Sequence, residues 1–396
     1  METPSNVTET AAEIENWREG GFGLYLHWPF CAAKCPYCDF NSHVVENIDI
    51  DRWANAYLTE IARLAETLED RILDSVFIGG GTPSMMPPRL VERLLDAIVR
   101  RWRVANALEI TLEANPTSSD AQKFRDFAAV GVNRLSVGLQ ALDDDALRKL
   151  GRLHDAKEGL AAYESARRAV ERVSFDLIYA RQDQSLPAWQ EELAQALALE
   201  PSHLSLYQLT IEEGTVFSQR QKRGGLRGLP DEDLAVALYD HTLTACDKAG
   251  LRSYEVSNFA HEGAESRHNL IYWRGGDYGG IGPGAHGRLT LDGQRWATRS
   301  ALTPGEWLQR VEKTSNGEDL REALQDGEAA EEYLMMGLRL SEGIDEARYR
   351  RLGGNGLQDK VIDTLLAEGL CWRAGGRLGL TSEGRMVMDA LLVRLL

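Results

Sequence analysis

The chain has 396 residues, of which 44 are Lys or Arg and 61 are Asp or Glu, so its formal net charge is −17. Hydrophobic residues make up 43%, which is ordinary for a globular protein, and the length favours more than one domain. Phosphate backbones repel so acidic a chain, so we do not expect it to bind nucleic acid.

The N-terminal residues 1–20 are polar and acidic, and we predict a disordered tail there. They have neither the basic start and apolar stretch of a signal peptide nor the Arg-rich composition of a mitochondrial transit peptide. No apolar run approaches the ~20 residues that cross a bilayer, so peripheral contact is the only form of membrane association we consider. Five cysteines in so long a chain do not indicate a disulfide scaffold, which favours a cytoplasmic protein.

Strands and helices are predicted to alternate through the first half of the chain. Apolar patterns predict strands at Leu24–Trp28, Ser75–Ile78, Glu109–Glu113, Asn133–Gly138, Val173–Tyr179 and His203–Leu209. They predict helices at Ile50–Asp70, Leu90–Trp102, Asp120–Val130, Ala156–Val170 and Leu186–Leu199. Six such alternations imply parallel strands with right-handed crossovers, short of the eight that close a full barrel.

The pattern changes beyond Glu213. A Gly-rich basic loop is predicted at Gln219–Pro230, then a helix at Asp231–Ala249, an edge strand at Leu251–Asn258 and a hairpin at Arg288–Thr298. The last hundred residues are predicted to be mostly helical, and a helix at Leu357–Glu368, a hairpin at Leu370–Leu380 and a helix from Thr381 suggest a winged-helix-like module. The expected division is a tail at 1–20, a barrel at 21–218, a linker and motif region at 219–300, and a C-terminal domain at 301–396.

Three cysteines, Cys31, Cys35 and Cys38, fall within eight residues in the pattern C-x3-C-x2-C. Three thiolates on one loop satisfy three irons of a [4Fe–4S] cluster and leave the fourth iron open for a small molecule. The alternative is a zinc site with His27 or His43 as the fourth ligand. Zinc sites usually combine a C-x2-C pair with a second pair further on, and that second pair is missing here.

Other polar residues follow, end or interrupt predicted strands, and the C-terminal ends of such strands carry the chemistry in α/β barrels. The GGGTPS stretch at Gly79–Ser84 lets the backbone approach a ligand closely. Glu113 and Gln140 each end a strand, although a solvated loop carboxylate is the alternative for Glu113. Arg152 can pair with a carboxylate. Asp176 interrupts an apolar strand, where a charge is costly unless it is paired or used.

The C-x3-C-x2-C spacing followed by GGGTPS resembles the radical S-adenosylmethionine (SAM) superfamily. Within it, HWPFCAAKCPYCDFNSH at residues 27–43 is similar to the branch that contains oxygen-independent coproporphyrinogen III dehydrogenase and the HemW heme chaperones. The resemblance implies an α/β fold with an open, partial (β/α)6 barrel, a [4Fe–4S] cluster and bound SAM. It implies contact with one of two SAM sites for Tyr25, Gly80, Gly81, Thr82, Glu113, Gln140, Arg152 and Asp176, and a place beside the second SAM for Tyr37.

One rim loop departs from this branch. Its members usually continue the DLIY strand with a Pro-Gly turn, whereas this chain continues it with Ala180-Arg181-Gln182-Asp183. The resemblance therefore does not define the shape of this loop.

His268, Asn269, Tyr272 and Trp273 form the motif H-N-x-x-Y-W. Imidazole is a common axial ligand of heme iron, and aromatic rings offer flat apolar faces to a porphyrin. A histidine near aromatic residues is more often a core or surface residue, but the resemblance favours heme because this motif marks the heme-chaperone branch. In a helix His268 and Tyr272 would share a face. The Gly279–Gly287 stretch is expected to approach the cluster or cofactor, and its His286 is the next candidate for the iron ligand.

The resemblance leaves two functions to weigh. A heme chaperone would bind the cluster, SAM and heme, and would deliver heme to client hemoproteins, with respiratory-chain enzymes among the candidate clients. A coproporphyrinogen III dehydrogenase would carry out a radical decarboxylation in porphyrin biosynthesis. The dehydrogenases have a fourth cysteine, in C-x3-C-x2-C-x-C, where this chain has Phe40. We therefore favour the chaperone and expect no dehydrogenase activity.

Overall fold

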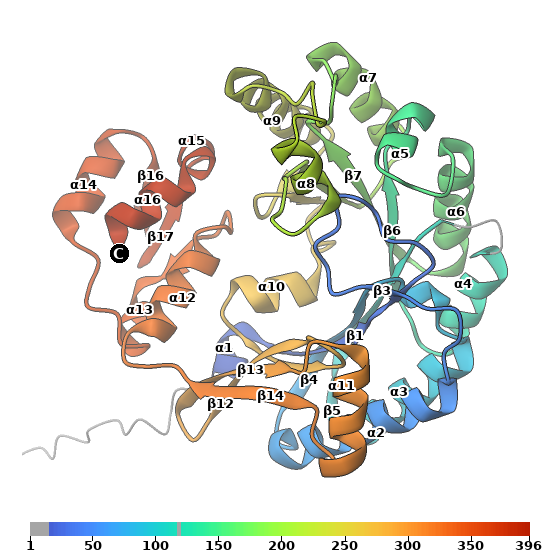
Figure 1. Cartoon of the computed structure of the whole chain (residues 1–396). Coiled ribbons are helices and arrows are strands. Elements are labelled where there is room, and N and C mark those ends of the chain that lie inside the picture. Colours follow the sequence, from blue (N-terminus) through green and yellow to red (C-terminus); the bar gives the residue numbers. More distant parts are fainter. Residues whose placement is uncertain (1–15, 117–119) are drawn as a thin grey trace, which may run out of the picture.

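The computed structural model describes residues 16–116 and 120–396, so most of the expected N-terminal tail lies outside the described residues. A twelve-stranded sheet forms the centre of the molecule (Figure 1). Six neighbouring strands run parallel: β1 (Phe22–Trp28), β4 (Ile72–Gly80), β5 (Arg103–Ala114), β6 (Arg134–Gln140), β7 (Arg172–Tyr179) and β8 (His203–Gln208). The predicted partial (β/α)6 barrel is confirmed.

Amphipathic helices cover the outer face of these strands (Figure 1). They are α2 (Ile50–Leu68), α3 (Pro88–Val99), α4 (Asp120–Ala129), α6 (Ala156–Ala169), α7 (Leu186–Leu197) and α9 (Glu232–Lys248). In α2, Trp53, Tyr57 and Ile61 recur every four residues and are buried, which places one apolar face on the sheet. The Asp49 side chain begins this helix by accepting a hydrogen bond from the Arg52 backbone N–H at 3.1 Å.

The sheet extends beyond the barrel on the β1 side. β11 (Asp277–Ile281) runs parallel to β1, and β12 (His286–Leu291), β13 (Gln294–Ser300) and β14 (Glu318–Ala323) follow antiparallel. The predicted hairpin is confirmed, but β11 and β14 were not predicted. Buried Asp277 ties the extension together, because it accepts hydrogen bonds from the N–H (2.6 Å) and the hydroxyl (2.9 Å) of Thr290 and pairs with Arg71 and Arg295.

At the opposite edge, the predicted single strand at Leu251–Asn258 is wrong. Only β9 (Arg252–Ser253) and β10 (Asn258–Ala260) are paired, and the residues between them form a bend that lets β10 run antiparallel to β8. The predicted loop at Gln219–Pro230 begins inside a helix, since α8 (Val216–Lys222) starts with Thr215 as its cap. Two short helices, α5 (Asp144–Lys149) and α10 (Arg267–Trp273), complete the barrel region.

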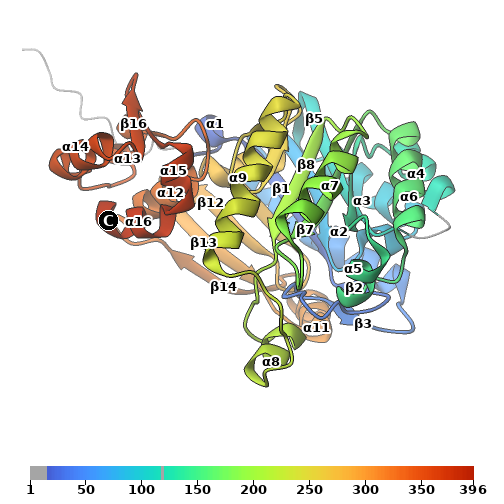
Figure 2. The ribbon, with the colours of Figure 1, turned by 90° about the horizontal axis from the view of Figure 1, so that it is seen from above.

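The C-terminal part packs around its own core, which includes Leu334, Ile344, Leu365, Leu378 and Leu391. The helix α11 (Pro304–Thr314) precedes this part and packs against the barrel. The elements of the C-terminal part are α12 (Glu328–Gly337), β15 (Ile344–Asp345), α13 (Glu346–Arg351), α14 (Asp359–Ala367), β16 (Cys371–Ala374), β17 (Arg377–Leu380), α15 (Ser382–Met386) and α16 (Met388–Leu395). The order helix, hairpin, helix confirms the winged-helix-like module. Figure 2 shows this C-terminal module beside α9. No described helix is long and apolar enough to cross a membrane.

Candidate functional site

The three clustered cysteines lie on the loop that joins β1 to β3 (His43–Val44) and includes β2 (Phe30–Cys31). We call this segment, residues 30–43, the cysteine loop. It covers one end of the barrel strands and closes a cavity of about 400 Å³, the cysteine cavity. Of the residues predicted to hold the cluster or SAM, this cavity is lined by Cys31, Cys35, Tyr37, Cys38, Gly80, Gly81, Thr82, Glu113, Gln140, Arg152 and Asp176. The structure thus brings together residues from five of the parallel strands or the loops after them.

The cysteine side chains contact polar groups of the barrel. The Thr82 hydroxyl donates to Cys31 Sγ at 3.4 Å, and Arg152 Nη1 donates to Cys35 Sγ at 3.6 Å. Burial raises the pKa of the thiols of Cys31 and Cys38, so without a bound cation they stay protonated. A bound iron or zinc ion would hold them as thiolates.

The histidines of the zinc alternative are engaged elsewhere. His27 Nε2 donates to the Asn41 carbonyl at 2.8 Å, and His43 Nε2 is 2.9 Å from the Asn41 side-chain oxygen. Within residues 16–116 and 120–396, no group of three His, Cys, Asp or Glu side chains is spaced to hold a single metal ion. A zinc ion needs its ligands ~2.0–2.3 Å away, whereas each iron of a cluster takes one thiolate. With both histidines engaged, the three cysteines are the side chains of this loop that remain for a metal centre.

Asn41 also joins the cysteine loop to the glycine-rich stretch of the sheet extension. Its side-chain amide donates to the carbonyls of Pro283 (2.9 Å) and Leu302 (2.8 Å). The Gly279–Gly287 stretch, which we expect to approach the cluster or cofactor, thus contacts the cysteine loop through Asn41. His286, in contrast, is exposed on β12.

The glycines after β4 meet the cysteine loop at backbone distance. Gly81 N–H donates to the Trp28 carbonyl at 2.7 Å, and a Cβ at Gly81 would lie 2.6 Å from the Phe30 carbonyl oxygen. Gly80 has a φ of 113°, which side chains rarely adopt, and its N–H donates to Glu113 Oε2 at 3.1 Å. Only glycine allows this contact between loop and strand.

Two carboxyl groups lie in the same cavity. Burial, with the nearby charge of Asp176 as the second cause, raises the pKa of Glu113 to about 8. Burial raises the pKa of Asp176 to about 6, and hydrogen bonds from Ser205 and Ser136 oppose that rise. Within the described residues, no Lys or Arg side chain forms an ion pair with either carboxyl, so a cationic or hydroxyl-rich ligand is favoured next to them.

Arg152 and Gln140 form the rim opposite the cysteines. Arg152 Nη2 donates to the Asn115 side-chain oxygen (2.8 Å) and the Gly138 carbonyl (2.9 Å), so the guanidinium is fixed beside Cys35. Gln140 ends β6 with a φ of 71°, uncommon for a residue with a side chain. This backbone strain lies where Gln140 turns into the cavity.

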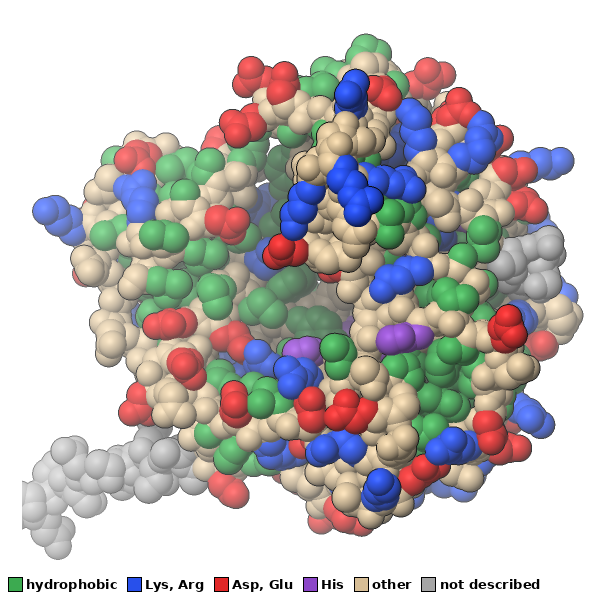
Figure 3. All heavy atoms as spheres, in the orientation of Figure 1, with side chains coloured by type: hydrophobic (Ala, Val, Ile, Leu, Met, Phe, Trp, Pro, Cys, Tyr) green, Lys and Arg blue, Asp and Glu red, His purple; other side chains and the backbone are tan. Residues whose placement is uncertain are grey.

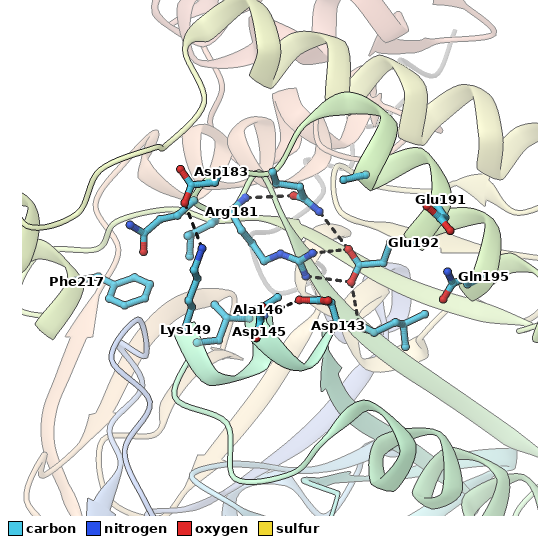
Figure 4. Close-up of a pocket in the computed structure, with 16 residues that line it drawn as sticks. Asp143, Asp145, Ala146, Lys149, Arg181, Asp183, Glu191, Glu192, Gln195 and Phe217 are labelled. Carbon is cyan, nitrogen blue, oxygen red and sulfur yellow. Dashed lines mark hydrogen bonds and ion pairs between the residues drawn. The ribbon is translucent and has the colours of Figure 1, made fainter.

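Figure 4 shows the rim loop Ala180–Asp183, whose sequence departs from the branch that this chain resembles. The buried Arg181 guanidinium pairs with buried Glu192, whose Oε1 accepts from Arg181 Nη1 at 3.1 Å. Asp183 N–H donates to the Gly228 carbonyl at 2.7 Å, and the Asp183 carboxylate pairs with Lys149 at 3.2 Å. Side chains thus define this loop, which lacks the Pro-Gly turn that the resemblance implies.

The H-N-x-x-Y-W motif forms α10 and lies apart from the cysteine cavity. His268 is 1% exposed and both ring nitrogens are engaged: Nδ1 lies 2.7 Å from the Ser75 hydroxyl, and Nε2 lies 2.7 Å from the Tyr272 hydroxyl. The motif is helical, and the shared face of His268 and Tyr272 is confirmed. Burial lowers the pKa of His268 to about 3, so the imidazole is neutral. In this conformation it offers no free nitrogen to iron.

The other two motif residues are more accessible. Asn269 and Trp273 are half-buried, and the Arg339 guanidinium lies 4.7 Å from the centre of the Trp273 ring. Tyr25 lies deeper in the barrel than the cysteine cavity, with its hydroxyl 2.9 Å from His27 Nδ1 and its ring stacked on Phe77. Tyr25 and α10 therefore share the inner face of the sheet rather than the cavity.

Sequence reasoning missed several residues of the cavity. Asn115, Ser136 and Tyr207 line it. Asn115 follows Glu113 in the EANP stretch that ends β5, so its position was a usable signal. Ser136 and Tyr207 resemble ordinary strand residues, and only the register of the sheet turns them inward.

Two family profiles match the chain. The Radical SAM superfamily profile matches residues 25–185, and the HemN C-terminal domain profile matches residues 324–387. The solved structure of coproporphyrinogen III oxidase (HemN) from Escherichia coli, a radical SAM enzyme, superposes with a TM-score of 0.80 over 97% of this chain and 92% of that chain. At 20% identity, this likeness shows the fold alone.

Full-length relatives are more similar in sequence. The mitochondrial radical S-adenosyl methionine domain-containing protein 1 of Mus musculus is 41% identical over 94% of this chain and 87% of its own length. The heme chaperone HemW of Escherichia coli is 35% identical over 93% of this chain and 96% of its own length. HemW of Bacillus subtilis is 33% identical, with coverage of 92% and 96%.

Proposed function

This chain belongs to the HemW family of radical SAM proteins, and from that premise we propose that it is a heme chaperone that holds a [4Fe–4S] cluster, SAM and heme. In this proposal it delivers heme to client hemoproteins, among which respiratory-chain enzymes are candidates, in the reducing cytoplasm. The observation that carries the proposal is the cysteine cavity, where three cysteines meet two carboxyls and an arginine on a HemW-like chain.

In this proposal, different residues of the cysteine cavity hold the cluster and SAM. Cys31, Cys35 and Cys38 would hold three irons of the cluster, which supplies an electron to SAM in radical chemistry. The Gly80–Thr82 backbone and the Arg152 guanidinium would orient SAM, and Glu113 would accept hydrogen bonds from its ribose hydroxyls. Gln140, Asp176 and, beside the third cysteine, Tyr37 would line the space for SAM.

The heme part of the proposal starts from His268, Asn269, Tyr272 and Trp273. For His268 to ligate iron, its Nε2 would have to give up its hydrogen bond with the Tyr272 hydroxyl and bind the metal instead. Asn269 would orient the imidazole or a propionate, and the aromatic rings would cover a porphyrin face.

One preparation tests both cofactors. Anaerobic reconstitution with iron and sulfide should load about four irons per chain. Replacing any of the three cysteines with Ala should abolish the broad cluster absorption. Stoichiometric zinc without iron uptake would contradict the cluster, and failure of the loaded wild type to bind hemin would contradict the chaperone.

The competing function is coproporphyrinogen III dehydrogenase. Phe40, at the position of the fourth cysteine, is 58% exposed on the cysteine loop, so no thiol supports that reaction there. The reconstituted protein should therefore not convert coproporphyrinogen III in the presence of SAM and a reductant. Robust turnover would move the protein to the dehydrogenase class. Phe40→Cys alone should not create the activity.

A further inference from the structure

A basic segment, residues 216–227, lies beside the cysteine loop of a chain that is otherwise acidic. It contains α8 and the turns after it, with four of the chain's 44 Lys and Arg residues and none of its 61 Asp and Glu residues. The four basic residues are exposed, and they are Arg220, Lys222, Arg223 and Arg227. Figure 3 shows Lys and Arg side chains gathered over the segment around α8, at the edge of the hollow in this face of the molecule.

Most of these charges are not neutralised by the chain itself. Lys222 pairs with Glu213 at 3.2 Å. Within the described part of the chain, the three arginines of the basic segment form no ion pair with a carboxylate. Arg220 instead lies over the Phe217 ring, 5.8 Å from its centre. Because like charges held close together repel one another, the basic segment favours an anionic partner.

Contacts with the cysteine loop fix the position of α8. Phe217 is 2% exposed, and its N–H donates to the Pro36 carbonyl at 2.9 Å. The centre of its ring lies 6.3 Å from the centre of the Tyr37 ring. Pro36 and Tyr37 stand between Cys35 and Cys38 in the chain, so α8 is held beside the cysteines that would hold the cluster.

Exposed apolar side chains lie next to the same loop. Phe40 of the loop is 58% exposed, and Leu302, whose carbonyl accepts from the Asn41 side chain at 2.8 Å, is 57% exposed. Leu153 is 77% exposed and follows Arg152 of the cavity rim. In Figure 2 the strands of the cysteine loop, β2 and β3, lie on the same side of the molecule as α8. Apolar residues bordered by charged ones are the usual composition of a protein–protein interface.

The position of this face indicates the kind of partner. When the proposed cluster gives an electron to SAM, an external carrier must replace that electron. The cysteine loop has one exposed base, Lys34, and one exposed acid, Asp39, so the positive charge of this face comes from the basic segment. A carrier with an acidic surface would be steered to the basic segment and would bring its redox centre to the cysteine loop.

We propose that Arg220, Arg223 and Arg227, together with Phe40, form the docking surface for an acidic one-electron carrier protein that reduces the cluster. This inference rests on the cluster of the proposed function. In each encounter the carrier loses one electron and the cluster gains it, so no covalent bond forms or breaks and no proton moves. Electron-transfer pairs of proteins bury less than ~1,200 Å² in total, and one short helix beside one loop suits so small an interface.

The test uses flavodoxin, a small acidic FMN protein, as the probe. Its binding to the reconstituted protein is measured by titration with the oxidised probe, and the reduction of the cluster is measured by stopped-flow absorbance with the fully reduced probe. In the double variant Arg220→Glu/Arg223→Glu, the affinity and the rate should both fall roughly tenfold or more at low ionic strength. Phe40→Ser should weaken binding at every ionic strength. Reduction by photoreduced deazaflavin, a small uncharged reductant, should be unchanged in both variants.

The matched control is Arg125→Glu/Arg168→Glu, which makes the same change of charge on α4 and α6, on the outer face of the barrel. Both arginines are exposed, and within the described residues neither forms an ion pair. The control should bind flavodoxin and accept its electron like the wild type. Raising the ionic strength from ~0.05 M to ~0.5 M should weaken the wild type and the control towards the level of the double variant. Equal iron content shows that each variant is folded and loaded.

The outcomes separate this inference from the proposed function. If the wild type loads no iron, the proposed cluster fails and the docking surface with it. If the loaded wild type does not bind flavodoxin, or if the double variant binds it as tightly as the wild type, the docking surface is refuted while the cluster stands. Sedimentation with anionic phosphatidylglycerol vesicles tests the other class of partner. Vesicle binding that the double variant loses, without binding of flavodoxin, would make this face a membrane surface and overturn the proposal.

Discussion

The binding of SAM should depend on pH through Glu113. This carboxyl has a pKa of about 8 in the ligand-free cavity, where burial is the largest cause and the charge of Asp176 the second. The proposed role requires the ionised form, because a carboxylate accepts two hydrogen bonds from a ribose more readily than a carboxylic acid does. Below pH 8, SAM must therefore displace the proton of Glu113 when it binds. The apparent affinity of the protein for SAM should fall as the pH falls.

The magnitude follows from the pKa. Because the apparent dissociation constant scales with one plus the ratio of protonated to ionised carboxyl, it should rise roughly 30-fold between pH 9 and pH 6.5. At pH 7.5 the binding of one SAM should release roughly 0.8 proton, since about that fraction of Glu113 is protonated beforehand. Asp176, with a pKa of about 6, adds a further decrease only at the acidic end.

The assay is isothermal titration of the reconstituted protein with SAM at pH 6.5, 7.5 and 9, in two buffers of different ionisation enthalpy. Glu113→Gln is the matched control, because an amide cannot titrate: its affinity should be low and nearly independent of pH above 7. An affinity of the wild type that stays constant from pH 6.5 to 9, or an equal slope in Glu113→Gln, would refute the role of this carboxylate.

Three further predictions concern stability and loading. Because the pKa of Glu113 rises from 4.5 to about 8 on folding, the protonated form stabilises the fold at low pH, and this contribution is lost as the pH rises to 8. Glu113→Gln should thus have a larger free energy of unfolding than the wild type at pH 9, by at most ~5 kcal/mol. At pH 4 the two proteins should be equally stable. Glu192→Ala leaves a buried guanidinium unpaired and should cost ~3–5 kcal/mol in urea unfolding, whereas exposed Glu191→Ala should change it by less than ~0.5 kcal/mol. Gly81→Ala should lower iron loading, because its Cβ would meet a main-chain oxygen of the cysteine loop at 2.6 Å. Gly305→Ala, which has open space around its Cβ, is the control and should load iron normally. Equal iron loading of the two variants would contradict the close-contact argument.

The six barrel strands were predictable because central parallel strands are buried on both faces and appear in sequence as short apolar runs. Two strands of the sheet extension were not predictable, since β11 (DYGGI) and β14 (EDLREA) contain too few apolar residues to signal a strand. Their pairing depends on contacts far apart in sequence, such as Asp277 with Arg71. The bend between β9 and β10 depends in the same way on buried Glu255, which accepts from the N–H of Ser257 and the amide of Asn258.

Most of the cysteine cavity could be located from sequence, because short motifs at strand ends converge wherever parallel strands align. What sequence could not supply is the availability of each side chain. The H-N-x-x-Y-W pattern favours His268 as an iron ligand, yet Ser75, 193 residues away in the chain, occupies one of its ring nitrogens. Which ring nitrogen is free depends on how α10 packs against β4, and that packing joins residues far apart in the sequence.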